Sequence, residues 1–457
     1  MVKVFSKGRL LAAVMIALSV FHAVVVWLSS YSRGDCDDKA VHYYSSSYVL
    51  AAAPARAAVL DTLPAWLEKL PASRKKVRLE NRILSAWNYP AADVAIGMMR
   101  AMTGGRFTRA VKLAMLLLFC AALIWLVIAA GVLDRGRLLV AAVLLIGASS
   151  VLIIPPWLSL PRFNMNPFTA YVPRGSACFL VLGVMLAAAA RRPWLVCASA
   201  LLVAAWHTAF ALLVLPMVAI GVLFGGLQTR TETLPTFKLL GWLLPGLALA
   251  AGVAMLGWGV TMGGAGRVPV SMTSAVLASC GWSVLLLAAV IAVWLWSGWS
   301  GPLGVAYDRL LLSVLGFLLC IKLFLLTHGV MQVLTGTGDI GGVYLASQIP
   351  MRLGGVDYLH GILLVVLAAW MLAARVAMRW PRARRLMIAA AVVLLVLAAW
   401  VRRDAYACLV PGHGTIWNEI CDVQPRDDVT AETLPTLDPA DEPAFFRDIG
   451  EFLFRSR

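Results

Sequence analysis

The chain has 457 residues, of which 61% are hydrophobic and only 14% are charged, and its formal net charge is +16. Soluble domains are about half apolar and about a quarter charged, so this composition excludes a water-soluble globular protein. The basic residues gather in short breaks between apolar runs, such as 134–137, 191–193 and 375–385. This placement is typical of the cytoplasmic loops of membrane proteins. Nucleic-acid binding is excluded, because it requires basic residues interleaved with exposed aromatic residues on a soluble domain.

The first apolar run, at about 10–29, follows a short basic segment and predicts an uncleaved signal-anchor helix with a cytoplasmic N-terminus. Residues 1–30 therefore form the N-terminus and first span, and residues 31–110 a long first extracytoplasmic loop. Within this loop, residues 61–71 and 82–106 carry apolar side chains at helical spacing. This spacing predicts amphipathic helices that lie on the membrane face.

Further apolar runs of membrane-crossing length fill residues 111–401. A span needs about 20 residues, so the run at 193–229 is long enough for two crossings, which would meet near His207. The sequence thus predicts an all-α polytopic integral membrane protein with about 11 transmembrane helices, within a range of about 10–13. Residues 402–457 then form an extracytoplasmic tail. The expected spans lie at about 10–29, 111–132, 138–155, 175–190, 193–229 (two), 239–260, 276–297, 309–327, 359–376 and 386–401.

Three carboxylates, Asp35, Asp37 and Asp38, lie within four positions directly after the first span. One interpretation is a solvated, charged end of the helix. However, the cluster is held at the membrane surface, and like charges this close repel one another, which favours a cationic partner or a bound proton. A carboxylate in this position can act as a general base toward an acceptor hydroxyl.

Basic side chains occur on the same predicted face of the membrane. Arg162 and Arg174 bracket the segment 161–175, whose three prolines exclude a plain helix. Arginine binds phosphate oxygens in a bidentate manner, so a phosphate-binding role is one interpretation. The other is that both side chains extend from an apolar surface to the membrane interface.

Four more residues are candidates for the same role, each with a structural alternative. Lys322 lies inside an apolar run, where an ionisable residue is a functional candidate by default, and reaching the nearby membrane surface is its alternative. Arg352 precedes His360 by eight positions, and His207 lies at the expected turn between two spans. A hydrogen-bonded structural role is the alternative for the histidines. No HExxH, CxxC or Walker motif is present, while Cys408 and Cys421 would pair only if the tail faces an oxidising compartment.

This pattern resembles the GT-C superfamily of membrane glycosyltransferases. Members have a cytoplasmic N-terminus, one span, and a long first extracytoplasmic loop with amphipathic helices that opens on an acidic motif, and GDCDDKAVHYY at 34–44 is similar in position and character. The resemblance implies inverting transfer from a polyprenyl-phosphate-linked sugar to a glycan or lipid-linked acceptor in the bacterial inner membrane. It implies that Asp35, Asp37 or Asp38 is the base, with Asp35 favoured. It also implies that basic residues near the outer face hold the donor phosphate, and the candidates are Arg162, Arg174, Arg352, Lys322, His207 and His360.

The sequence departs from the family in one respect. Many members carry a second acidic motif in the next outer loop, whereas residues 156–175 contain no Asp or Glu. We therefore expect no metal site and do not favour a divalent metal. The alternatives to glycosyl transfer are a polymerase or ligase of lipid-linked polysaccharide, a solute transporter and a non-catalytic scaffold.

Overall fold

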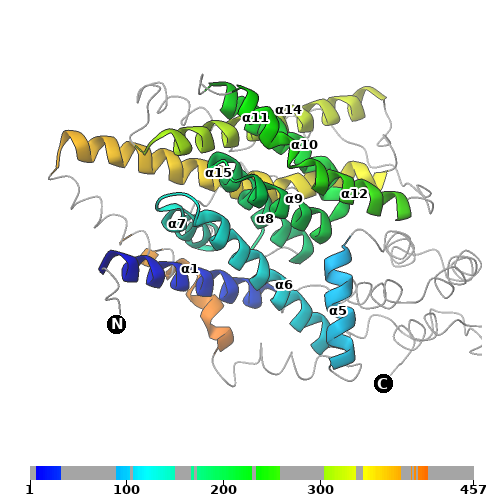
Figure 1. The fold of residues 1–457 in the computed structure, drawn as a ribbon. Helices are drawn as coiled ribbons and strands as arrows, with labels where there is room; N and C mark the ends of the chain where they lie inside the picture. Colours follow the sequence, from blue (N-terminus) through cyan, green and yellow to red (C-terminus); the bar gives the residue numbers. More distant parts are fainter. Residues whose placement is uncertain are drawn as a thin grey trace, which may run out of the picture.

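The computed structural model describes residues 7–31, 89–102, 107–149, 166–168, 172–228, 233–257, 303–335, 343–381, 393, 396–397 and 400–409. Every regular element within these ranges is helical (Figure 1). The predicted catalytic residues Asp35, Asp37 and Asp38 lie outside the described residues, as do Arg162 and the expected span at 276–297.

Eleven α-helices and one short 3-10 helix make up the described fold. They are α1 (Lys7–Tyr31), α5 (Pro90–Met102), α6 (Phe107–Ala130), α7 (Gly136–Ser149), α8 (Val172–Ala189), α9 (Pro193–Trp206), α10 (Thr208–Gln228), α11 (Thr233–Gly241), α12 (Leu244–Gly257), α14 (Val305–Thr335), α15 (Val343–Arg379) and η2 (Arg403–Leu409).

Among the described residues, five helical segments are long and apolar enough to cross a membrane. They are Leu113–Ala130, Thr208–Gly226, Pro235–Val253, Val305–Thr327 and Leu353–Arg379. Helices α1, α7, α8 and α9 carry shorter apolar stretches. The structure thus agrees with an all-helical protein that has membrane-like helices, and the expected total of about 11 spans stays a prediction.

Several expected boundaries agree with the structure and others differ. The run at 193–229 is divided into α9 and α10 at His207, as the sequence predicts. Helix α5 occupies the second amphipathic segment expected in the first loop, and its buried residues Ala92 and Ile96 lie one turn apart. By contrast, the segment 328–358, which lies between the expected spans at 309–327 and 359–376, is largely helical, because α14 and α15 leave only residues 336–342 between them.

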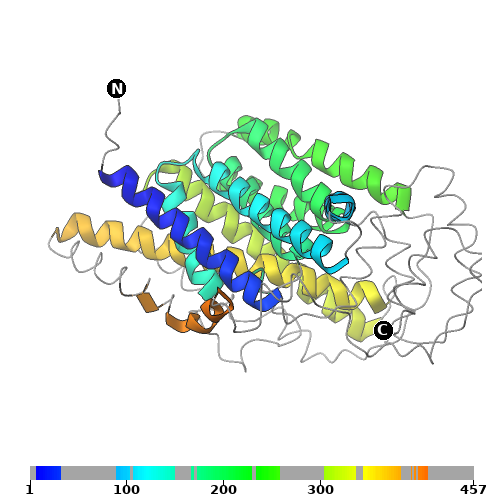
Figure 2. The same ribbon diagram turned by 90° about the horizontal axis from the view of Figure 1, so that it is seen from below.

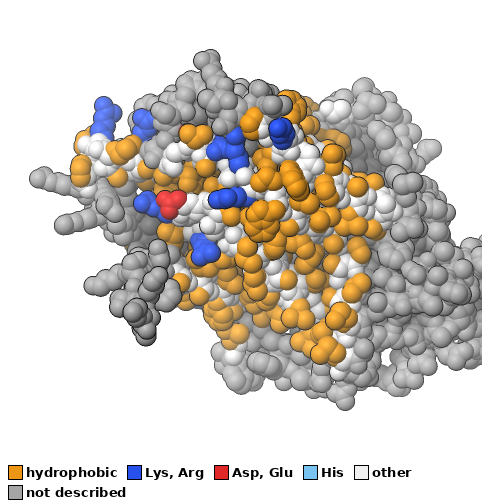
Figure 3. All heavy atoms as spheres, viewed as in Figure 1, with side chains coloured by type: hydrophobic (Ala, Val, Ile, Leu, Met, Phe, Trp, Pro, Cys, Tyr) orange, Lys and Arg blue, Asp and Glu red, His pale blue; other side chains and the backbone are white. Residues whose placement is uncertain are grey.

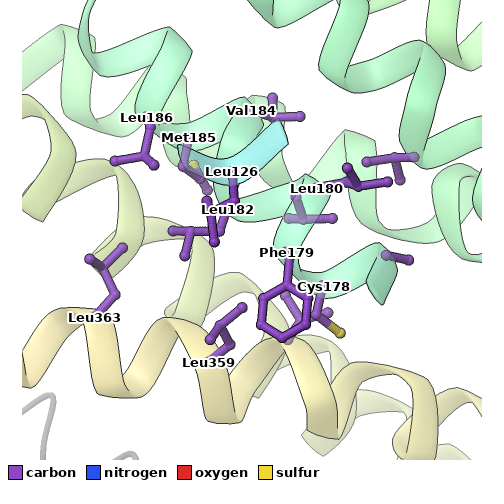
Figure 4. Close-up of a cluster of buried hydrophobic side chains, with 14 of the residues drawn as sticks. Leu126, Cys178, Phe179, Leu180, Leu182, Val184, Met185, Leu186, Leu359 and Leu363 are labelled. Atoms are coloured by element: carbon purple, nitrogen blue, oxygen red, sulfur yellow. The ribbon is translucent and has the colours of Figure 1, made fainter. Parts of the chain in front are cut away.

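Helix α8 lies at the centre of the bundle. Every residue from Gly175 to Ala189 is buried, and helices α6, α9, α10, α14 and α15 all pack against it. Figure 4 shows its side chains directed both toward α15, at Leu359 and Leu363, and toward Leu126 of α6. A helix that is apolar on all sides is stable only when neighbouring helices enclose it, so α8 forms the core around which the others pack.

Glycines allow α10 and α14 to approach closely. A Cβ atom at Gly221 would lie 2.6 Å from the carbonyl oxygen of Ser313, and one at Gly225 would lie 2.8 Å from the carbonyl oxygen of Arg309. Gly316 of α14 faces α10 in the same way, since its Cβ would lie 2.9 Å from Cβ of Phe224. The spacing of Gly221 and Gly225 is the small-xxx-small pattern that permits backbone contact between membrane helices.

Basic side chains gather at one end of the bundle (Figure 3). The hydroxyl of Tyr307, in the first turn of α14, donates to the carbonyl of Asp134 in the turn between α6 and α7. This contact places the start of α14 at the same end as the basic turn that contains Arg135 and Arg137. On the face shown in Figure 3, Lys and Arg side chains gather toward the left, at the end where α7 lies in Figure 1, whereas apolar side chains cover much of the remainder.

We predict that Gly225→Leu destabilises the bundle, because the added side chain would clash with the backbone of α14 at Arg309 and Ser313. Overpacking of this kind typically costs about 1–3 kcal/mol. Thermal unfolding in detergent measures the effect. Gly252→Leu is the matched control, since no atom lies within 4 Å of a Cβ placed at Gly252. Equal unfolding temperatures for the two variants would contradict the close α10–α14 contact.

Candidate functional site

Arg174 lies in the first turn of α8, at the end of the bundle opposite the basic turns. Its Nε donates a hydrogen bond of 3.0 Å to the hydroxyl of Tyr89. Tyr89 directly precedes Pro90, the first residue of α5, and proline is well suited to that first helical position. The hydrogen bond therefore joins the residue before α5, inside the predicted first loop, to the start of the central helix.

His207 lies beside the same tyrosine. It interrupts the helical backbone between α9 and α10 with φ of −156°, and its N–H donates to the carbonyl of Val203. Its ring is buried, with its centroid 4.4 Å from that of Tyr89 and 5.5 Å from that of Phe210. The break between the two helices thus places an imidazole inside the bundle, in contact with an aromatic ring from the first loop.

Arg174, Tyr89 and His207 together form what we call the Tyr89 cluster. Two of the six residues predicted to bind the donor phosphate, Arg174 and His207, contact the same tyrosine ring or hydroxyl. Tyr89 was not among the site residues predicted from the sequence. The signal that could have identified it is its position directly before a proline at the start of an amphipathic helix.

A second polar site lies between α14 and α15, where Lys322 forms an ion pair with Asp357. The distance from Nζ to Oδ2 is 2.7 Å, and both residues are buried. An ion pair in an apolar interior offsets the desolvation of its two charges only when the geometry is close, as it is here. Lys322 was predicted to bind phosphate, and the structure gives its ammonium group an internal carboxylate partner.

His360 follows Asp357 by one turn of α15 and is fully buried. Its Nδ1 lies 2.8 Å from the carbonyl of Val356, and its ring packs edge-on against Phe317 with centroids 4.9 Å apart. Asp357 was not predicted from the sequence as a partner of Lys322. The sequence did contain a signal for it, because Asp357 lies directly before the expected span at 359–376. An ionisable residue in or next to a span is a functional candidate by default.

A third polar group joins three segments that are distant in the sequence. Nδ1 of His22 lies 2.6 Å from the hydroxyl of Tyr406, and Nε2 lies 2.8 Å from the hydroxyl of Ser149. These contacts join α1, α7 and η2, and Figure 2 shows α1 beside the orange η2 segment. Burial raises the pKa of Tyr406, so its hydroxyl stays protonated and can donate to His22. Both ring nitrogens of His22 are therefore used in holding helices together.

Arg352, the cysteines and the possible metal ligands complete the residues considered from the sequence. Arg352 lies in α15 rather than in a loop, so the backbone places it on a helix that continues to Arg379. Cys120, Cys178, Cys197 and Cys320 are free thiols. The described ranges contain no group of three or more His, Cys, Asp or Glu residues arranged to hold a metal ion.

The helices and their polar contacts define the class of protein: an all-helical integral membrane protein with buried polar groups between its apolar helices. No protein-family model, no curated protein and no solved structure matches this chain.

We predict that Lys322→Met strongly destabilises the protein, because it leaves the carboxylate of Asp357 buried without its ammonium partner. Removing one member of a buried pair costs about 3–5 kcal/mol, whereas replacing both with apolar residues is often neutral. The double variant Lys322→Met/Asp357→Leu should therefore recover most of the lost stability. Thermal unfolding of the three proteins in the same detergent measures this. A single variant as stable as the wild type would show that the pair is not buried as described.

Proposed function

We propose that this protein is a GT-C-type membrane glycosyltransferase that moves a sugar from a polyprenyl-phosphate donor to a glycan or lipid-linked acceptor with inversion. The observation that carries the proposal is the Tyr89 cluster. It brings the arginine of α8 and a histidine from a helix break into contact with Tyr89 of the first loop. Sugar transfer from a lipid phosphate requires a basic group at the phosphate and a base for the acceptor. Arg174 supplies the basic group, and the first loop, which opens with three aspartates, supplies the base.

The guanidinium of Arg174 is suited to the donor phosphate by its geometry. Arginine carries five N–H donors in a rigid plane, and the bond from Nε to Tyr89 fixes the orientation of that plane. A guanidinium held in advance stabilises the developing phosphate charge without reorganisation during the reaction. His207 packs against the same tyrosine and so holds its ring in place.

The chemical step then divides between the start of the first loop and the start of α8. One of Asp35, Asp37 and Asp38 removes the proton from the acceptor hydroxyl, whose oxygen attacks the anomeric carbon of the sugar. The bond from that carbon to the phosphate oxygen breaks, and the electron pair leaves with the polyprenyl phosphate. Arg174 stabilises this leaving group, with Arg162 and Arg352 as further predicted phosphate ligands. A phosphate leaving group is already activated, so the proposal needs no metal.

The charge distribution supports an extracytoplasmic position for the Tyr89 cluster. Arg191 and Arg192 lie at the other end of α8 from Arg174, the end where α8 packs beside the end of α6 that leads into the basic turn at 134–137. Short basic loops favour the cytoplasmic side of a bacterial inner membrane. The Tyr89 cluster, the first loop and the C-terminal tail would then face outward, and the N-terminus inward.

We predict that single cysteines at Ser32 and Thr430 react with a membrane-impermeant maleimide in intact spheroplasts, whereas Arg382→Cys reacts only after lysis. The background carries alanine at the native cysteines. Arg382 lies in the basic segment 375–385, and short basic loops stay on the cytoplasmic side, where the maleimide cannot reach them in intact spheroplasts. Reactivity of Arg382→Cys in intact cells would overturn the proposed orientation.

We predict that replacing the base by asparagine lowers the rate of sugar transfer by about 10²–10⁴-fold. Asp35→Asn, Asp37→Asn and Asp38→Asn are compared with the wild type in proteoliposomes that contain radiolabelled polyprenyl-phosphate sugars. Arg174→Gln should lower the rate by about 10²-fold, because it removes the positive charge at the leaving group. Tyr89→Phe should have a smaller effect, since it removes only the hydrogen bond that orients the guanidinium.

Arg403→Gln is the control, because Arg403 is exposed and pairs only loosely with Asp404, at 3.9 Å. Full activity of all three asparagine variants would refute the assignment of the base. Absence of any reaction or binding with polyprenyl-phosphate donors would refute the enzyme class.

One observation favours a second function, solute transport. Transporters place ionisable residues between helices inside the membrane, and Lys322 and Asp357 form such a pair between α14 and α15. Uptake of labelled solutes into proteoliposomes, lost in Lys322→Met/Asp357→Leu and retained in Asp35→Asn, would support this function over glycosyl transfer.

A further inference from the structure

His360 is the buried histidine of α15, and its Nε2 has no hydrogen-bond partner within the described part of the chain. Its Nδ1 lies 2.8 Å from the carbonyl oxygen of Val356. A carbonyl oxygen can only accept, so Nδ1 carries the ring proton and Nε2 presents a bare lone pair. The side chain is fully buried, and its ring packs edge-on against Phe317 of α14. A buried acceptor without a donor is unfavourable by about 1–3 kcal/mol, so this nitrogen is a candidate binding atom.

The ion pair of Lys322 and Asp357 lies close to this imidazole on the same interface. Asp357 and His360 are three positions apart on α15, a spacing that places their Cβ atoms about 5–6 Å apart on one side of the helix. Both face α14, since Asp357 contacts Lys322 at 2.7 Å and the ring centroids of His360 and Phe317 are 4.9 Å apart. One carboxylate, one ammonium group and one neutral imidazole thus meet here, and their charges sum to zero.

Asp357 is the carboxylate within reach of His360 on the described helices that surround it. Helices α7, α8 and α14 pack against α15, and the other carboxylate on these three is Asp308. Asp308 precedes Phe317 by nine positions on α14, or about 13 Å along the helix. The further titratable side chains of the three helices are Arg137 on α7, Arg174 and Cys178 on α8, and Tyr307, Arg309, Cys320 and His328 on α14.

We propose that His360 is a proton-binding site, and that Asp357 exchanges Lys322 for the protonated imidazole when the proton binds. While Lys322 neutralises Asp357, an imidazolium one turn away would be a buried charge without a counterion, which is strongly unfavourable. If Lys322 withdraws, Asp357 and the protonated ring neutralise one another instead. The long aliphatic stem of lysine lets its ammonium group reach the membrane surface. The one bond that forms is N–H at Nε2, and the solvent supplies the proton.

This exchange links the contact between α14 and α15 to pH. The state with the Lys322–Asp357 pair holds His360 neutral, whereas the exchanged state holds one more proton. The first state is therefore favoured at high pH, and the balance shifts toward the second by up to about tenfold per unit decrease in pH, the limit for one proton. The site shares no residue with the Tyr89 cluster and does not depend on the proposed glycosyl transfer.

Nitrogen NMR of the full chain in detergent, with isotope-labelled histidine, measures the proton on Nε2 directly. The signal of His360 is assigned by its loss in His360→Phe. At about pH 8 we expect a protonated Nδ1 and a bare Nε2 in the wild type. Lys322→Met should raise the pH at which Nε2 takes up its proton by about one unit or more, a tenfold change in proton affinity, because Asp357 then has no competing ammonium group. Asp357→Asn should lower this pH, because the imidazolium loses its counterion.

His22 is the internal control, since its ring nitrogens are hydrogen bonded to Tyr406 and Ser149, and neither substitution should change its titration. A proton already present on Nε2 of His360 at about pH 8 would overturn the proposal. An uptake pH that Lys322→Met leaves unchanged would overturn it as well.

A second measurement keeps the proposal testable if Lys322→Met is too unstable for spectroscopy. The unfolding temperature of Lys322→Met in detergent should rise as the pH falls from about 8 to about 5, because protonated His360 then neutralises the carboxylate of Asp357. The double variant Lys322→Met/His360→Phe should lose most of this rise. An equal rise in both variants would show that Asp357 takes up the proton itself, and it would refute His360 as the binding site.

Discussion

The burial of α8 on all sides is the constraint on which the rest of the structure depends. No residue from Gly175 to Ala189 contacts the surroundings of the bundle, so α6, α9, α10, α14 and α15 must enclose it (Figure 4). Close-packed interiors leave little freedom for side chains to move, and a helix held this way has a fixed position and rotation. Its two ends consequently carry their side chains at defined places, with Arg174 at one end and the turn at Arg191 at the other.

Close packing around α8 also explains where polar groups are tolerated. Within an apolar bundle a polar side chain is stable only with a partner, and the structure provides partners from distant parts of the chain. Lys322 is neutralised by Asp357 on the neighbouring helix, and His22 is hydrogen bonded to Ser149 and Tyr406. If Lys322 bound the donor phosphate, its ion pair with Asp357 would have to separate, at a substantial cost in free energy.

The parts of the fold that sequence reasoning predicted are those encoded locally. Long apolar runs are sufficient to locate the helices, and the break at His207 follows from the length of the run at 193–229. The extent of α14 and α15 could not be predicted in this way. The facing ends of these two helices are polar, and hydropathy does not distinguish a polar helix end from a loop. The partnership of Tyr89 with Arg174 was also beyond prediction, since the residues are 85 positions apart and no periodicity relates them.

The length of α8 decides how the charged groups at its ends can act. Arg174 and Arg191 are separated by about five turns of helix, or roughly 25 Å, which approaches the thickness of the hydrocarbon core. One phosphate therefore cannot contact both arginines, and the two ends of α8 are separate basic environments. At one end an aromatic hydroxyl orients the guanidinium, as a reacting phosphate would require. At the other, Arg191 adopts a left-handed backbone conformation in the turn between α8 and α9. The same rigid helix thus fixes the proposed catalytic arginine beside Tyr89 at one end and the turn at Arg191 at the other.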